Sequence, residues 1–220
     1  MEDKDRAFRI LQLLRETYPK AKRTSLRFES PFQLLIATVL SAQCTDEKVN
    51  QVTRELFKKH RTAKDFAEAD INELKEAIRP TGFYSVKAKR IKEISETLIR
   101  DYGSDIPRTV EQLTKLKGVA RKTANIVLTN AYGIVEGIAV DTHVMRLSQR
   151  LGLTKNKNRD KIEKDLLQLI PKENWPDVNT LLIEHGRRIC KAQRPKCKTC
   201  VIRDLCPSGE QFIRTGKNGA

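Results

Sequence analysis

Apolar residues recur at helical spacing along most of the chain. Between Asp5 and Tyr18, the residues Phe8, Leu11 and Leu14 predict an amphipathic helix. A continuous apolar run, PFQLLIATVLSA, begins at residue 31 and reaches residue 42; its length fits a buried core helix and is too short to cross a membrane. The same periodicity predicts further helices at 46–60, 71–78, 85–102, 110–117, 121–131, 142–152, 160–170 and 177–190.

Capping signals set the starts of several of these helices. Asp70 with Glu73, and Thr109 with Gln112, have the spacing of capping boxes. Asp141 or the threonine after it is expected to cap the helix that ends at the glycine of residue 152. Only residues 137–140 suggest a strand, and residues after 208 are expected to fray. The pattern therefore predicts an all-α fold with short connections.

Composition and charge narrow the functional class. The 220 residues, 39% of them hydrophobic, suffice for one large or two small domains with real cores. A charged N-terminus without an apolar core argues against secretion, which predicts a cytoplasmic, nucleoid-associated protein if the source is prokaryotic. The net charge of +15, spread along the chain, favours nucleic acid as a partner. The alternative is a surface that is merely basic, as on ribosomal and some thermophile proteins.

Four of the five cysteines fall close together near the C-terminus. Cys190, Cys197, Cys200 and Cys206 have the spacing C-x6-C-x2-C-x5-C, which indicates metal binding rather than disulfides. Four thiolates suit either zinc or an iron–sulfur cluster. Structural zinc sites usually pair two short cysteine elements, and only one is present here, which modestly favours a cluster. Cys44, within the long apolar helix, is interpreted as a small buried residue.

A helical hairpin is predicted over LTKLKGVARKTANIVL, from Leu113 to Leu128. Gly118 lets the chain take a positive φ in the turn. The second helix starts directly afterwards, so its free backbone N–H groups are available to a DNA phosphate. The alternative interpretation is an ordinary helical hairpin packed in the core.

The segment LKGVARKTA resembles the helix-hairpin-helix of the endonuclease III family, whose common form is LPGVGRKTA. In that family the hairpin presents N–H groups to phosphate. This chain departs at two positions, with Lys117 in place of proline and Ala120 in place of the second glycine. Alanine keeps its backbone N–H, and Lys117 would add a charge beside the phosphate. The cysteine spacing is also that of the family's 4Fe–4S box, and the resemblance extends from about Phe8 to Cys206.

The resemblance identifies Lys122 with the family's catalytic lysine. The electropositive start of the second hairpin helix favours a neutral amine there, and a neutral amine forms Schiff bases. VDTHV matches the segment with the catalytic carboxylate, which implies that Asp141 activates Lys122 and stabilises charge at C1′. Taken alone, Asp141 is a helix N-cap and Lys122 one exposed lysine among many. His143 is given no chemical role.

The resemblance also implies DNA contacts and a cofactor. Gln43, in SAQCTD, matches the glutamine that fills the space of an extruded nucleotide. Phe83, in TGFYSVKAKRI, matches an apolar wedge that is usually leucine. The alternatives are a capping-region glutamine and a core phenylalanine. The implied 4Fe–4S cluster, on the four clustered cysteines, organises a basic loop that meets the DNA backbone and includes Lys191.

The implied architecture has two all-α domains with DNA in the cleft between them, and Lys122 and Asp141 facing across it. Residues 22–133 would form a six-helix domain ending in the hairpin, and 1–21 plus 134–220 the iron–sulfur cluster domain. The implied substrate is double-stranded DNA with a damaged base or an abasic site. A monomer is the default expectation, because the DNA supplies the second surface. The implied protein would be a bifunctional DNA glycosylase/AP lyase that removes oxidised pyrimidines and cuts the strand by β-elimination.

Three other functions compete with this hypothesis. A mismatch thymine or uracil glycosylase of the same superfamily can lack the lysine, so Lys122 argues against a purely monofunctional enzyme. An adenine glycosylase would need a glutamate in the helix at 31–43, and this stretch has no carboxylate. A non-catalytic DNA-binding iron–sulfur module would need the hairpin, the charge and the cysteines, but neither Lys122 nor Asp141.

Overall fold

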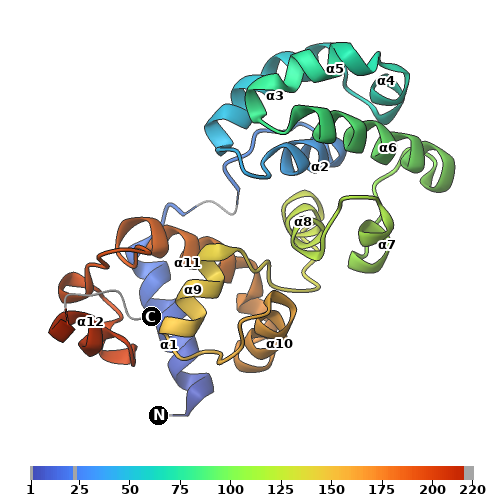
Figure 1. Cartoon of the computed structure of the whole chain (residues 1–220). Coiled ribbons are helices and arrows are strands. Elements are labelled where there is room, and N and C mark those ends of the chain that lie inside the picture. The colour runs from blue at the N-terminus through green and yellow to red at the C-terminus, as the bar shows by residue number, and fades with distance from the viewer. Residues whose placement is uncertain (1, 22–23, 216–220) are drawn as a thin grey trace. The chain divides into compact units, whose positions relative to one another are not determined.

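The computed structural model describes residues 2–21 and 24–215, and throughout this part of the chain the regular structure is helical (Figure 1). The all-α prediction is therefore confirmed. No helix in the described ranges is both long and apolar enough to pass through a membrane. The α-helices are α1 Asp3–Thr17, α2 Pro31–Leu40, α3 Asp46–Lys59, α4 Ala63–Glu68, α5 Ile71–Ile78, α6 Tyr84–Tyr102, α7 Val110–Lys115, α8 Arg121–Val127, α9 Thr142–Arg150, α10 Arg159–Leu169, α11 Trp175–Arg188 and α12 Gly209–Thr215.

These helices form two compact units, each with its own hydrophobic core. The continuous unit is Thr24–Glu136 and contains α2 to α8. The discontinuous unit joins the described residues before Thr24 to those from Gly137 onward, so α1 belongs with α9 to α12.

The apolar helix α2 is the core of the continuous unit. Every residue from Phe32 to Leu40 is buried, as the uninterrupted apolar run predicted. The helix begins where it does because Ser30 accepts a hydrogen bond from the Gln33 N–H (3.2 Å) and Pro31 occupies the first turn. It packs against α3, α6 and α8, and α6 also packs against α4 and α5.

The discontinuous unit is built on the N-terminal helix. The apolar stripe of α1 formed by Ala7, Ile10, Leu11 and Leu14 is buried and lies against α10 and α11, whereas Phe8, which the sequence pattern grouped with it, is 45% exposed. Arg15 ties the exposed side of α1 to the start of α11 through Asp177 (3.0 Å) and Asn174 (3.0 Å). Residues at the beginning of the described chain are therefore required for the core that carries the C-terminal cysteines.

The prediction of a strand at residues 137–140 is wrong. The segment is buried, but no strand is assigned to it within the described residues. Side chains satisfy its backbone instead: Ile138 N–H donates to the Glu163 carboxylate (3.2 Å), and the Asn179 amide donates to the Ala139 carbonyl (2.8 Å). The apolar side chains of this segment are buried, and its backbone partners come from helices.

Two helix predictions also need correction. Fraying after residue 208 is wrong as far as Thr215, because α12 forms there and places Phe212 under the Arg150 guanidinium, 4.6 Å from the ring centre. The helix expected at 121–131 is α8 up to Val127 and continues as a π-helical turn from Leu128 to Tyr132. The short α4, with its Thr62–Asp65 capping box, was not predicted.

The predicted caps are confirmed only in part. Asp70 accepts from the N–H groups of Asn72 and Glu73, but the Glu73 carboxylate binds Lys59 and does not return to the cap. Thr109 accepts from the Gln112 N–H (3.2 Å), while its hydroxyl donates to the Gln112 side chain (3.1 Å). Each helix start is correct, but the reciprocal half of each box is replaced by a different contact.

Candidate functional site

The predicted hairpin is formed by α7, a tight turn and α8. Leu116 and Val119 are buried in the turn, and the Val119 N–H donates to the Leu116 carbonyl (3.0 Å). Gly118 lies between them, exposed, with φ of +86°. A Cβ at this position would lie 2.8 Å from Cδ of the exposed Arg90 side chain of α6, which is flexible and can move aside, so it is the positive φ that favours glycine here.

The two departures from the common hairpin sequence have different structural consequences. Ala120 is the N-cap of α8 and is exposed, so the first N–H groups of the helix lack a side-chain cap. Lys117 is exposed, but its Nζ lies 3.0 Å from Glu93 of α6. The charge that Lys117 was expected to contribute is thus partly balanced within the protein.

Lys122 is the second residue of α8 and is half-buried. It follows the exposed Arg121, and two residues later Ala124 is fully buried. Within the described part of its unit, the Lys122 amine forms no hydrogen bond or ion pair. An amine that no neighbouring side chain of the described residues occupies is available for nucleophilic attack.

Asp141 is the N-cap of α9, as predicted. Its Oδ1 accepts from the Val144 N–H (2.8 Å), and the side chain is half-buried. One carboxylate oxygen is thus used by the cap. Two residues on, the half-buried His143 contacts the Arg146 guanidinium (3.1 Å), which also donates to the Cys190 carbonyl (3.1 Å). Lys122 belongs to the continuous unit and Asp141 to the discontinuous unit.

Gln43 and Phe83 share an unusual backbone. Both are non-glycine residues in the left-handed region, with φ of 55° and 48°. Phe83 is 64% exposed, so it is not a core residue, and Gln43 is exposed while Thr45 caps α3. Strained backbone that holds out a large apolar ring is typical of functional positions. Cys44, beside Gln43, lies in the turn after α2 and is half-buried, so its placement within the helix was wrong.

The four clustered cysteines surround one cavity of the discontinuous unit. Cys190 follows α11, Cys197 begins a 3-10 turn that Cys200 follows, and Cys206 follows a second 3-10 turn. All four are half-buried free thiols that line the same cavity, together with Leu147, Ile202 and Phe212. Among the described residues no three metal-ligating side chains are gathered around a single point. Four thiols around a shared cavity are the donor set that a 4Fe–4S cluster uses.

Buried polar groups border the cysteine cavity. Burial raises the pKa of Cys200 to about 11 and lowers the pKa of His185 to about 4. His185 is held between the Tyr18 hydroxyl (2.9 Å) and the Cys200 sulfur (3.4 Å). Arg150 Nη1 lies 3.4 Å from the Cys190 sulfur. A metal centre that deprotonates these thiols would thus find a cation and a neutral imidazole beside them.

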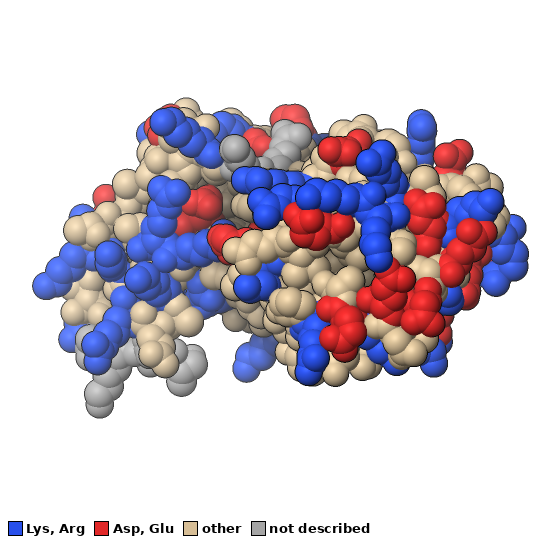
Figure 2. All heavy atoms as spheres, turned by 90° about the horizontal axis from the view of Figure 1, so that it is seen from above, with Lys and Arg blue, Asp and Glu red and all other residues tan. Residues whose placement is uncertain are grey.

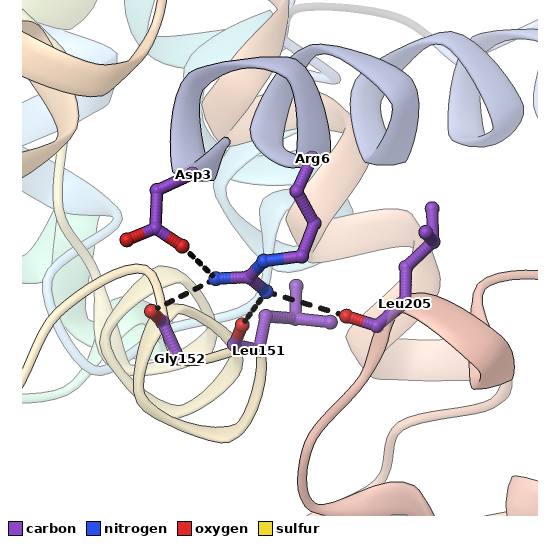
Figure 3. Close-up of polar contacts among 5 residues, drawn as sticks. All are labelled: Asp3, Arg6, Leu151, Gly152 and Leu205. Carbon is purple, nitrogen blue, oxygen red and sulfur yellow. Dashed lines mark hydrogen bonds and ion pairs between the residues drawn. The ribbon is translucent and has the colours of Figure 1, made fainter. Parts of the chain in front are cut away.

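The cysteine loops are anchored at both ends by arginines. Arg150 donates to the Lys191 carbonyl (2.7 Å) and the Ala192 carbonyl (2.9 Å), which fixes the first cysteine interval and leaves the Lys191 side chain exposed. Arg6 of α1 donates to the carbonyls of Leu151 (2.6 Å) and Leu205 (3.3 Å), the latter beside the last cysteine, as Figure 3 shows.

Basic side chains are not confined to one loop. Lysine and arginine lie across the whole of the face drawn in Figure 2, with acidic side chains among them and most frequent toward the right of the view. In the first cysteine interval and just beyond it, Lys191, Lys196 and Lys198 are all exposed. A widely basic surface attracts a polyanion without selecting a sequence.

The sequence analysis did not identify several residues that hold the hairpin, the Gln43 and Phe83 turns and the cysteine loops in place. Lys87, Arg90, Arg150 and Arg6 make contacts with segments far away in the sequence. Only Lys87 had a signal in the sequence: it shares the helical spacing of Ile91, Ile94 and Leu98 on the apolar face of α6, so a buried cation could have been inferred.

The chain is similar to known base excision DNA repair proteins. Residues 36–172 match the HhH-GPD superfamily base excision DNA repair protein family. The chain is 47% identical to endonuclease III of Synechocystis sp. over 207 residues, 94% of each protein. A solved non-covalent endonuclease III–DNA complex is 42% identical with a TM-score of 0.91, over 98% of this chain and 100% of the other. A trapped covalent endonuclease III–DNA intermediate has the same identity and TM-score, over 97% and 100%.

Proposed function

This chain belongs to the HhH-GPD superfamily of base excision DNA repair proteins and, within it, to the endonuclease III family, and on that premise we propose that Lys122 and Asp141 carry out its reaction. The activity is that of a DNA glycosylase that also cuts the strand as an AP lyase. The observation that carries the assignment to Lys122 is its half-buried side chain, directly after the exposed hairpin turn, whose amine has no partner among the described residues of its unit.

The reaction begins with the Lys122 amine as nucleophile. Its nitrogen bonds to C1′ of the deoxyribose while the glycosidic bond breaks, and the departing base takes up a proton. Asp141 accepts the proton that the attacking amine loses and stabilises positive charge at C1′. The sugar ring opens to a Schiff base as O4′ takes up a proton, water removes a C2′ proton, and the C3′–O bond breaks by β-elimination with the 3′ phosphate leaving as its anion. Water then releases the lysine.

The hairpin and the two left-handed residues account for DNA binding. The exposed turn at Gly118 and the uncapped start of α8 offer N–H groups to a phosphate. Phe83 and Gln43 enter the duplex when the target nucleotide is extruded, one as a wedge and one as a plug. The substrates we assign are oxidised pyrimidines and abasic sites in double-stranded DNA, bound by a monomer.

We assign a 4Fe–4S cluster to Cys190, Cys197, Cys200 and Cys206, whose thiols line one cavity. Breaking a glycosidic bond is not a redox step, so the bound cluster would supply a rigid thiolate-ligated centre and no electron. Arg150 already holds the exposed loop that starts at Lys191 through hydrogen bonds to the loop's carbonyls. The cluster would fix this loop further, in a position where it can contact the DNA backbone.

Borohydride trapping tests the proposed activity. Wild-type protein is incubated with duplexes that contain thymine glycol, an abasic site or no lesion. A covalent adduct with the first two duplexes, and none with the third, is expected. Release of the base without an adduct would identify a monofunctional glycosylase. An adduct at the abasic site alone would support the lyase activity but contradict the assignment of oxidised pyrimidines as substrates. Uracil and thymine opposite guanine would then be the next bases to test.

Asp141→Asn should separate catalysis from capping. Asparagine is as good an N-cap as aspartate, so the melting temperature should stay within about 2 °C of wild type. Because the amide lacks a negative charge, base excision should fall by roughly 10²-fold or more. Asp141→Ala should lose the cap as well, about 1 kcal/mol of stability. Excision by Asp141→Asn at the wild-type rate would restrict Asp141 to its structural role.

A further inference from the structure

Lys87 is a buried cation that bridges two loops of the continuous unit. Its side chain is on the apolar face of α6, and the residue is only 4% exposed. The Nζ donates to the Leu40 carbonyl and to the Thr81 carbonyl, each at 2.8 Å. A buried ammonium is costly unless acceptors replace its water, so these two hydrogen bonds hold both segments to α6.

The carbonyls of Leu40 and Thr81 lie shortly before Gln43 and Phe83 in the sequence, the two residues that are proposed to enter the DNA duplex. Leu40 ends α2, three residues before Gln43, and Thr81 ends a 3-10 turn two residues before Phe83. Gln43 and Phe83 both have positive φ, a conformation that persists only where the surroundings enforce it. Lys87 supplies one such restraint to both at once, although the two segments are far apart in the sequence.

The hydroxyl groups near the two carbonyls make hydrogen bonds only within their own turns. The Thr81 hydroxyl donates to the Ile78 carbonyl (2.8 Å) within its own turn. The Ser41 hydroxyl donates to the Thr38 carbonyl (2.8 Å) within the end of α2. These contacts shape each turn separately, whereas the Lys87 ammonium contacts both.

We propose that Lys87 is a positioning residue that ties the Gln43 turn to the Phe83 turn, so that wedge and plug enter the duplex as one rigid pair. The inference rests on the proposed function, because it assigns the two residues to nucleotide extrusion. Lys87 then governs how readily the damaged base leaves the stack, and the chemistry of Lys122 is left unchanged. A substrate that needs no extrusion is therefore insensitive to Lys87.

The test compares Lys87→Met with wild type on two substrates. Methionine keeps the buried stem and removes both hydrogen bonds. Excision of thymine glycol from a duplex should fall by roughly 10- to 100-fold, the cost typical of misplaced groups. Cleavage of a single-stranded oligonucleotide with an abasic site should stay within about twofold, since the lyase step is retained. The fluorescence rise of a 2-aminopurine opposite the lesion, which reports unstacking, should shrink in parallel.

A second comparison guards against a variant that is simply less folded. In a Gln43→Ala, Phe83→Ala background, Lys87→Met should cost little further excision, because residues that act as a unit are not additive. Lys87→Gln, which keeps a donor, should lose less than Lys87→Met. Equal losses on both substrates, full additivity, or unchanged duplex excision would each overturn the proposal. Wild type failing to cleave either substrate would instead refute the proposed function.

Discussion

Lys122→Gln is expected to lower strand cleavage at an abasic site by roughly 10³-fold or more and to abolish borohydride trapping. Glutamine keeps a polar side chain of similar length at the second position of α8 but has no amine that could bond to C1′. The half-buried position makes replacement by a neighbouring lysine ineffective, because the nucleophile has to reach one carbon atom. Cleavage is measured on a labelled abasic duplex under single-turnover conditions.

The matched control is Lys115→Gln, in the first helix of the same hairpin. Lys115 is exposed and pairs with Glu111 one turn earlier (3.3 Å), so its loss removes the same charge without touching the proposed chemistry. Its cleavage rate should remain within about twofold of wild type, with a small change in salt dependence. Equal losses for the two variants would mean that lysine charge, and not the nucleophile, explains the effect of Lys122.

Cys200→Ser is expected to remove the bound iron and the broad absorbance near 400 nm that thiolate-ligated clusters give, roughly to background. Cys200 lines the discontinuous unit's cavity, with its sulfur 3.4 Å from His185. Because metal binding energy is folding energy for a site of this kind, the variant should also melt roughly 10 °C lower. Iron content, the spectrum and thermal unfolding are measured on the same preparation.

Cys44→Ser is the control for cysteine chemistry. Cys44 is half-buried like the other four, but it lies in the continuous unit, where it packs against that core. Its replacement should leave the iron content and the spectrum unchanged. A colourless wild-type protein that contains zinc and is fully active would contradict the cluster assignment, whatever the behaviour of the two variants.

The fold was predictable where local sequence decides the structure. The position of α2 follows from one apolar run with Ser30 and Pro31 at its start, and that of α9 from the cap at Asp141. The helices that were missed depend on other information. At six residues, α4 is too short to show a period, and α12 packs through Phe212 against an arginine of α9.

The candidate site divides in the same way. Lys122, Gly118 and the cysteines belong to contiguous motifs, so their residue types and spacing could be recognised. The residues that position them could not, because Arg6 and Arg150 act on carbonyls that any residue would provide. A partner that contributes only its backbone leaves no trace in the sequence. For this reason the anchors of the cysteine loops, and the link made by Lys87, required the structure.

The position of α1 in the discontinuous unit has a consequence for the order in which the two units fold during synthesis. The continuous unit, Thr24–Glu136, has all its core residues in one stretch, so it can fold on the ribosome while the rest is still being synthesised. The discontinuous unit cannot, since Ile10, Leu11 and Leu14 must wait for α10 and α11. The exit of the last of the four clustered cysteines therefore nearly coincides with the closing of that core, so we expect loading of the proposed cluster to be a late step of maturation.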